Sequence, residues 1–185
     1  MKLIFCDLQD DRVRALKEKF ESYPEVKIRK ADLTRIKADA WATAGNSFGD
    51  MGGGVDKAID DYFNGAAQPA VQTAIKKDYF GELPVGCSVA VKPASRKPTI
   101  IYAPTMRVPG RLPPSINPYL AMRSVLITAI TEEIKSLACP LFGTGVGGLS
   151  AADAADQLFQ AYRLIVGKEW QTIQHSLQAP YVMRD

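Results

Sequence analysis

Two glycine-rich segments carry the clearest capacity for chemistry in this 185-residue sequence. The first contains Gly52, Gly53 and Gly54, and the second runs from Gly143 to Gly148. Glycine lets a backbone approach a ligand closely, and a loop that opens a helix points free N–H groups at an anion. One such loop can be a simple tight turn. Two of them favour a ligand with two linked phosphates, held between two helix N-termini.

Two polar side chains stand beside the first glycine segment. Asp56 falls in the first turn of the helix expected after it, and a carboxylate beside a diphosphate gains proton affinity and can act as a general base. The alternative is that Asp56 only stabilises the helix dipole. Asn46, between Gly45 and Ser47, offers an amide to a ligand or occupies a turn.

Several other site classes are disfavoured by the residues present. No lysine follows the glycines as a P-loop requires, and residues 7–12 do not form the GxGxxG turn of dinucleotide enzymes. His175 is the single histidine, and Cys6, Cys87 and Cys139 form no CxxC pair. Histidine triads, zinc sites and disulfide frameworks are therefore disfavoured, and we predict neither a metal nor a cofactor.

Hydrophobic periodicity predicts alternating strands and helices. Strands are expected at residues 3–6, around 26–28, and at 38–44, 87–91, 99–103 and 141–142; helices are expected at 9–22, 55–63, 69–80, 119–137 and 151–166, the last capped by Ser150. Residues 104–118 hold five prolines and should form an irregular loop. This order predicts a single α/β domain over residues 1–185, whose largely parallel sheet binds ligands at the carboxyl ends of its strands.

Four segments, in order, resemble the macro domain family. Residues 31–34 (ADLT) resemble its GD[IV]T, residues 42–47 (ATAGNS) its VNAANS, residues 52–59 (GGGVDKAI) its GGGVDxAI, and residues 142–148 (FGTGVGG) its [IS]xTGxxG loop. The resemblance covers about residues 26–166. It implies a three-layer α/β/α fold with a mixed, largely parallel sheet, and a site for ADP-ribose.

The resemblance also implies roles for single residues. Asp32, with the Leu33 backbone nearby, would bind the adenine amino group, although a turn cap is the alternative for Asp32. Asn46 would bind the distal ribose, and Asp56 would activate water for attack at the anomeric carbon, which makes both catalytic candidates. The diphosphate would lie among backbone N–H groups of two loops: Gly52, Gly53, Gly54 and Val55 on one side, and Gly143, Thr144, Gly145, Val146 and Gly147 on the other.

Three residues depart from the family pattern: Thr43 stands for an asparagine, Asp60 for a histidine of many hydrolytic members, and Gly147 for an aromatic residue. Two functions therefore stay open. The chain hydrolyses an ADP-ribosylated protein or an ADP-ribose ester or phosphate, as an ADP-ribose-1-phosphate phosphatase would, or it reads ADP-ribose without turnover. The residue that covers the adenine is also open, with Tyr102 and Tyr181 as candidates and core packing favoured for Tyr102.

Charge and composition set the expected partners. The net charge is +3, and the basic residues are scattered rather than gathered in the dense stripe of a nucleic-acid binder. Arg107 could meet a phosphate or remain a surface residue. No apolar run reaches membrane-spanning length. We therefore expect a cytoplasmic protein whose partner is ADP-ribose or an ADP-ribosylated substrate, without membrane or nucleic-acid binding, and with its oligomeric state open.

Overall fold

A computed structural model describes residues 1–95 and 98–179. Its strands are β1 (Lys2–Asp7), β2 (Lys27–Lys30), β3 (Ala40–Asn46), β4 (Val89–Val91), β5 (Thr99–Met106) and β6 (Ser136–Cys139). Its α-helices are α1 (Asp10–Lys19), α2 (Gly54–Tyr62), α3 (Ala67–Tyr79), α4 (Asn117–Thr131) and α5 (Ala151–Ile165). Short 3-10 turns η1 (Leu33–Arg35), η2 (Pro93–Ser95), η3 (Glu169–Thr172) and η4 (Ser176–Gln178) complete the described chain.

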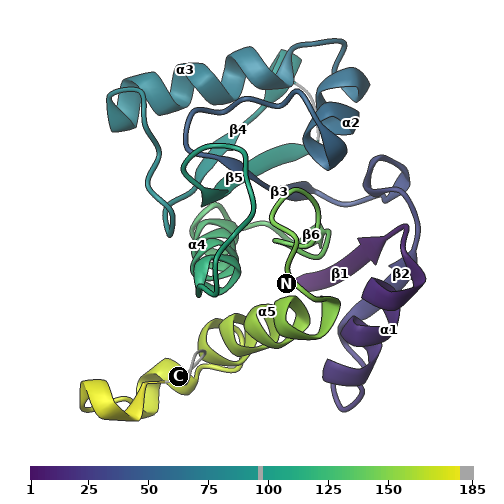
Figure 1. The fold of residues 1–185 in the computed structure, drawn as a ribbon, viewed down its shortest axis with the longest axis vertical. Coiled ribbons are helices and arrows are strands. Elements are labelled where there is room, and N and C mark those ends of the chain that lie inside the picture. Colours follow the sequence, from purple (N-terminus) through teal and green to yellow (C-terminus); the bar gives the residue numbers. More distant parts are fainter. Residues whose placement is uncertain (96–97, 180–185) are drawn as a thin grey trace.

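The strands form one sheet in the order β2-β1-β6-β3-β5-β4. All neighbours are parallel except β4, which runs antiparallel to β5. Figure 1 shows α1, α4 and α5 on one face of this sheet and α2 and α3 on the other. The expected three-layer α/β/α fold with a mixed, largely parallel sheet is confirmed.

Alternate residues of β1, β3, β5 and β6 pack into two separate cores, one on each face of the sheet. Leu3 and Phe5 of β1 pack with α1, α4 and α5, whereas Ile4 and Cys6 pack on the side of α2 and α3. A sheet covered on both faces needs apolar residues at successive positions, which explains the unbroken apolar run in β1. The carboxyl ends of the parallel strands are left for a ligand.

The long helix predicted over residues 119–137 is too long, and this expectation is corrected. Helix α4 ends at Thr131, Glu133 adopts a left-handed backbone with φ of 53°, and residues 136–139 form β6. The predicted strand at 141–142 is likewise wrong. Apolar residues continue with helical spacing beyond Thr131, so periodicity alone could not place the turn between the helix and the central strand.

After α5 the described chain forms η3, which lies against α5, and then η4. Tyr181, a candidate for covering the adenine, lies outside the described residues. In residues 1–95 and 98–179, no helix combines the length and apolar character needed to cross a membrane.

Candidate ligand cleft

A cleft of about 450 Å³ opens at the carboxyl ends of β1, β3, β5 and β6. Both glycine-rich loops line it, so the two predicted amide cradles do face one space. All the predicted site residues line the cleft except Asp32 and Leu33. The lining residues among them are Asn46, Gly52, Gly53, Gly54, Val55, Asp56, Gly143, Thr144, Gly145, Val146 and Gly147. The crevice rule for parallel sheets therefore locates this cleft correctly.

Unused backbone donors mark both loops. Helix α2 begins at Gly54, whose φ of 57° is in the left-handed region that favours glycine. Within the described chain, no protein acceptor takes the N–H groups of residues 53–55 or of residues 144–147. Gly52 differs, because its N–H donates to Asp50 Oδ1 at 3.0 Å. The cleft thus offers two sets of free donors, which suits an anionic ligand.

Asp56 is a buried carboxylic acid in this cleft. Burial raises its pKa from 3.8 to about 6; the Thr43 hydroxyl, which donates to Asp56 Oδ1, acts in the opposite direction, and Asp50 adds a smaller increase. Thr43, the residue that departs from the family asparagine, therefore holds the candidate base. A carboxyl with a pKa near 6 is suited to proton transfer at neutral pH.

The absence of a side chain at Gly45 leaves space for the Asp56 carboxyl. A Cβ at position 45 would lie 2.1 Å from the Tyr102 hydroxyl and 2.6 Å from Asp56 Oδ2, both far inside van der Waals contact. Only glycine therefore lets the end of β3 pass between the tyrosine and the aspartate.

Asn46 is held in place by a buried tyrosine. The Tyr102 hydroxyl accepts from Asn46 N and donates to Asn46 O, both at 2.9 Å, so Tyr102 is a core residue and not an adenine cover. The Asn46 side chain folds over the next turn: Nδ2 donates to Asp50 O at 2.9 Å, and Oδ1 accepts from Phe48 N at 3.0 Å. In this arrangement the amide holds the turn while lining the cleft.

Asp32 and Leu33 lie at the start of η1, outside the lining of the cleft. Asp32 Oδ1 accepts from the Thr34 N–H and hydroxyl, both at 2.8 Å, which is the turn cap that the sequence left as an alternative. Leu33 is buried in the core beside α2 and α3. Adenine recognition by this pair stays a prediction.

Two lining residues that sequence reasoning missed come from the N-terminal part. Asp7 ends β1, and Arg12 lies in the first turns of α1. Arg12 Nη1 approaches Asp7 Oδ1 at 3.4 Å, and Nη2 donates to Thr144 O at 3.1 Å. A polar residue directly after a buried strand was the available signal for Asp7, whereas nothing local marks Arg12.

Two further polar residues discussed from the sequence have structural partners outside the cleft lining. Asp60 Oδ1 accepts from Gln68 N at 2.9 Å and so caps the start of α3. Arg107 forms a two-bond ion pair with Glu82, with N–O distances of 2.6 and 3.0 Å, and lies over the Phe48 ring. Arg107 is therefore engaged in a surface cluster.

The thiols and the histidine take no part in the cleft. Burial raises the pKa of Cys6 to about 12, and Cys139 is raised for the same reason, so both thiols stay protonated at neutral pH. His175 is exposed, and its Nδ1 accepts from Leu177 N at 3.2 Å. Among the described residues, no group of three or more His, Cys, Asp or Glu side chains could hold a metal ion.

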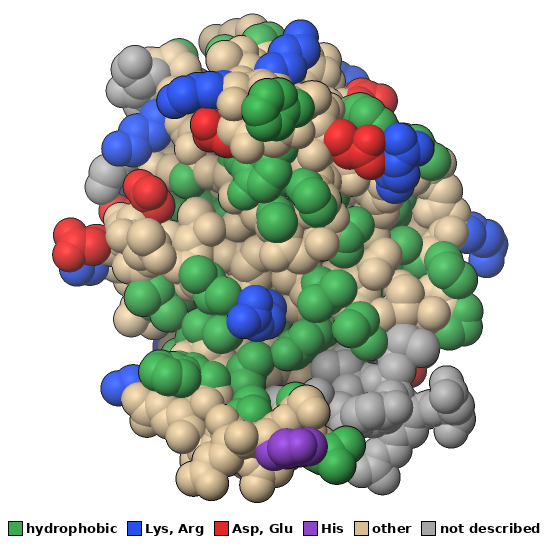
Figure 2. Space-filling model, turned by 90° about the vertical axis from the view of Figure 1, so that its left-hand side faces the viewer, with side chains coloured by type: hydrophobic (Ala, Val, Ile, Leu, Met, Phe, Trp, Pro, Cys, Tyr) green, Lys and Arg blue, Asp and Glu red, His purple; other side chains and the backbone are tan. Residues whose placement is uncertain are grey.

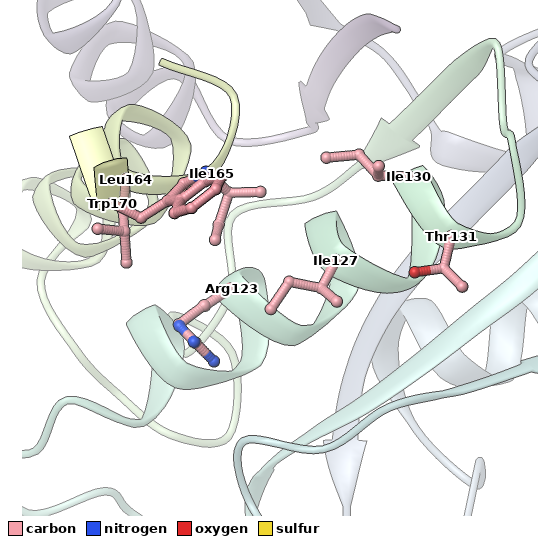
Figure 3. A pocket seen from close by; sticks show the side chains of 7 residues that line it. All are labelled: Arg123, Ile127, Ile130, Thr131, Leu164, Ile165 and Trp170. Atoms are coloured by element: carbon pink, nitrogen blue, oxygen red, sulfur yellow. The ribbon is translucent and has the colours of Figure 1, made fainter. Parts of the chain in front are cut away.

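A second hollow, of about 360 Å³, lies between α4 and the end of α5 (Figure 3). Its lining consists of Arg123, Ile127, Ile130, Thr131, Leu164, Ile165 and Trp170. This lining has no carboxylate, thiol or imidazole, and a guanidinium keeps its proton in a protein, so the hollow has no acid–base pair. Figure 2 shows that basic side chains on this side of the molecule are scattered and mixed with acidic ones.

The comparisons with known proteins agree with this geometry. A sequence model of the macro domain family matches residues 42–158. An uncharacterized protein of Aeropyrum pernix is 33% identical over 142 residues, covering 76% of this chain and 72% of the relative. One of Aquifex aeolicus is 31% identical over 140 residues, covering 75% and 81%.

Solved macrodomains share the fold. The macrodomain of Mycobacterium tuberculosis DarG superposes with a TM-score of 0.63 at 23% identity, covering 74% of this chain and 88% of its own. A variant of the Oceanobacillus iheyensis macrodomain, solved with ADPR, gives 0.60 at 24% identity, covering 71% and 72%. With the family match over residues 42–158 and the sequence relatives, these likenesses show that the chain belongs to the macro domain family.

Proposed function

We propose that the cleft binds ADP-ribose and that the protein hydrolyses an ADP-ribosyl derivative there. The observation that carries the binding proposal is the pair of loops with unused backbone N–H groups on one cleft. A diphosphate is an anion of the size to meet both loops at once, and each loop leads into a helix N-terminus that favours negative charge. A variant of the Oceanobacillus iheyensis macrodomain was solved with ADPR, and Thermosipho africanus DarTG was solved in complex with ADP-ribose.

The order of the strands orients the ligand within this proposal. The first loop and Asn46 follow β3, the second loop follows β6, and Asp32 follows β2 at the far edge of the sheet. With the diphosphate between the two loops, the distal ribose lies toward Asn46 and Asp56. The adenosine half then extends past β6 toward β1 and β2.

For hydrolysis we propose Asp56 as the general base. The carboxylate takes a proton from a water molecule while the water oxygen forms a bond to the anomeric carbon of the distal ribose. The bond from that carbon to the oxygen of the modified group breaks, and the leaving group departs with the bonding electron pair. The Thr43 hydroxyl bond to Oδ1 fixes the carboxylate, so Oδ2 remains for the water.

Binding is tested by calorimetry with ADP-ribose, AMP and NAD side by side. We expect ADP-ribose to bind more tightly than AMP, which lacks the second phosphate and the distal ribose. Gly145→Val should lower ADP-ribose affinity at least about 10-fold by filling the cradle, yet keep the melting temperature, because a Cβ there meets nothing within 4 Å. Absence of ADP-ribose binding to the wild type would reject the proposal.

Catalysis is tested by release of ADP-ribose from an ADP-ribosylated protein and from ADP-ribose 1-phosphate. Asp56→Asn should lower kcat/KM by about 100- to 10,000-fold while ADP-ribose binding persists, the size expected for loss of a general base. Asp61→Asn, an exposed residue on the same helix, is the matched control. Binding without turnover in the wild type would instead identify a reader of ADP-ribose. The expected cytoplasmic location also remains a proposal, tested by cell fractionation.

A further inference from the structure

The N-terminal corner formed by the end of β1 and the start of α1 contributes an edge of the cleft. This corner lies outside residues 42–158, the part matched by the family model. Its position follows from sheet order, because β1 runs between β2 and β6. The corner therefore stands between the second glycine loop and Asp32.

Hydrogen bonds connect this corner to both neighbours. The Ala31 N–H donates to Asp7 O at 3.1 Å, so Asp32 directly follows the residue that is bonded to the end of β1. On the other side, Arg12 donates to Thr144 O at 3.1 Å. A continuous row therefore leads from the second loop through Arg12 and Asp7 to Asp32. In the orientation proposed above, the adenosine half of the ligand lies along this row.

Arg12 has the chemistry for a planar aromatic base. Its side chain keeps 27% of its surface exposed, whereas its partner Asp7 keeps 7%. The guanidinium has five N–H donors, and described protein acceptors take two of them. Its flat face can stack on an aromatic ring, which an ammonium group cannot do.

Among the residues that line the described cleft, no other side chain offers such a cover. Phe142 is the one aromatic residue in the lining of the described cleft, and its ring is buried in the core with 1% exposed. Arg12 is also the single cationic residue in that lining. The acidic lining residues Asp7, Asp50 and Asp56 cannot stack on a base.

We infer that Arg12 is a specificity residue for the adenosine half of the ligand, with its guanidinium stacked on the adenine and held flat by Asp7 and the Thr144 carbonyl. This inference rests on the proposed ADP-ribose function and deepens it. It assigns base recognition to the N-terminal corner of this chain.

The test measures the affinities of ADP-ribose, AMP and inorganic pyrophosphate for the wild type, Arg12→Ala and Arg12→Lys. Both variants should bind ADP-ribose and AMP about 10-fold more weakly, because neither a methyl group nor an ammonium stacks flat on the adenine, while pyrophosphate affinity stays unchanged. Arg14→Ala, an exposed arginine two residues along α1, is the matched control and should bind all three as the wild type does.

Arg12→Lys keeps a positive charge beside Asp7, so it retains the ion pair if Arg12→Ala proves unstable. Wild-type AMP affinity in Arg12→Lys overturns the stacking role. An equal loss for pyrophosphate also overturns it, because Arg12 would then act on phosphate or brace the second loop. A wild type that binds pyrophosphate but not ADP-ribose rejects the proposed function itself, which separates the two failures.

Discussion

Replacing Asp56 with asparagine should make the folded protein more stable at neutral pH. The pKa of this carboxyl is raised from 3.8 to about 6 in the folded state because burial disfavours the charged form. At about 1.4 kcal/mol for each pKa unit, the charged carboxylate costs the folded state about 3 kcal/mol. Asparagine has nearly the same shape, accepts the Thr43 hydroxyl bond through its amide oxygen and has no charge to bury.

The pH dependence has a definite sign. The folded protein holds the Asp56 proton more tightly than the unfolded chain, so wild-type stability falls as pH rises from about 4 to about 6. Well below pH 3.8 the carboxyl is protonated in both states and the cost disappears. The free energy of unfolding of Asp56→Asn minus that of the wild type should therefore increase by about 2.4 kcal/mol between pH 4 and pH 7.

Urea denaturation at pH 4, 5, 6 and 7 measures this difference directly. At pH 7 it corresponds to a melting temperature about 6 to 12 °C higher for the variant, for a chain of this size. Asp61→Asn, on the exposed side of α2, should change stability by less than about 1 kcal/mol at every pH. A stability difference between wild type and Asp56→Asn that is flat across pH would refute a raised Asp56 pKa.

Three further substitutions test the scaffold of the cleft, each by chemical denaturation. Gly45→Ala should destabilise the fold by about 1–3 kcal/mol or more, because its Cβ would overlap the Tyr102 hydroxyl and Asp56; unchanged stability would contradict this packing. Tyr102→Phe should cost about 1–3 kcal/mol by leaving the buried backbone N–H and C=O of Asn46 without the hydroxyl, and a neutral effect would argue against both bonds. Ser150→Ala should cost about 1 kcal/mol through loss of the α5 N-cap, whereas Ser150→Asp should keep most of the capping stabilisation.

Local patterns in the sequence were sufficient to predict much of the fold. The alternation of apolar strands with amphipathic helices predicted the parallel sheet, and Ser150 was correctly predicted as the cap of α5. These features depend on neighbours within a few residues, so a single sequence contains them. The prediction of where α4 ends was wrong for the opposite reason. The apolar spacing continues from α4 into β6, so the end of the helix depends on burial of residues 136–139 in the sheet.

The features of the candidate cleft likewise fall into those that could be predicted from the sequence and those that could not. From the residues alone we could predict that two glycine loops exist, that each opens a helix, and that Asp56 falls in the first turn of α2. Glycine content and helix signals are properties of short segments, so they can be recognised without knowledge of the tertiary structure. The order of the segments was enough for the family resemblance.

The contacts between distant residues around the cleft became visible only in the folded chain. Thr43 reaches Asp56 across 13 residues, Tyr102 holds Asn46 across 56, and Arg12 meets Thr144 across 132. Such contacts depend on strand order and on the packing of both sheet faces, which local propensity does not encode. The acidity of Asp56 is likewise a property of burial, because the same carboxyl in the unfolded chain would titrate near 3.8.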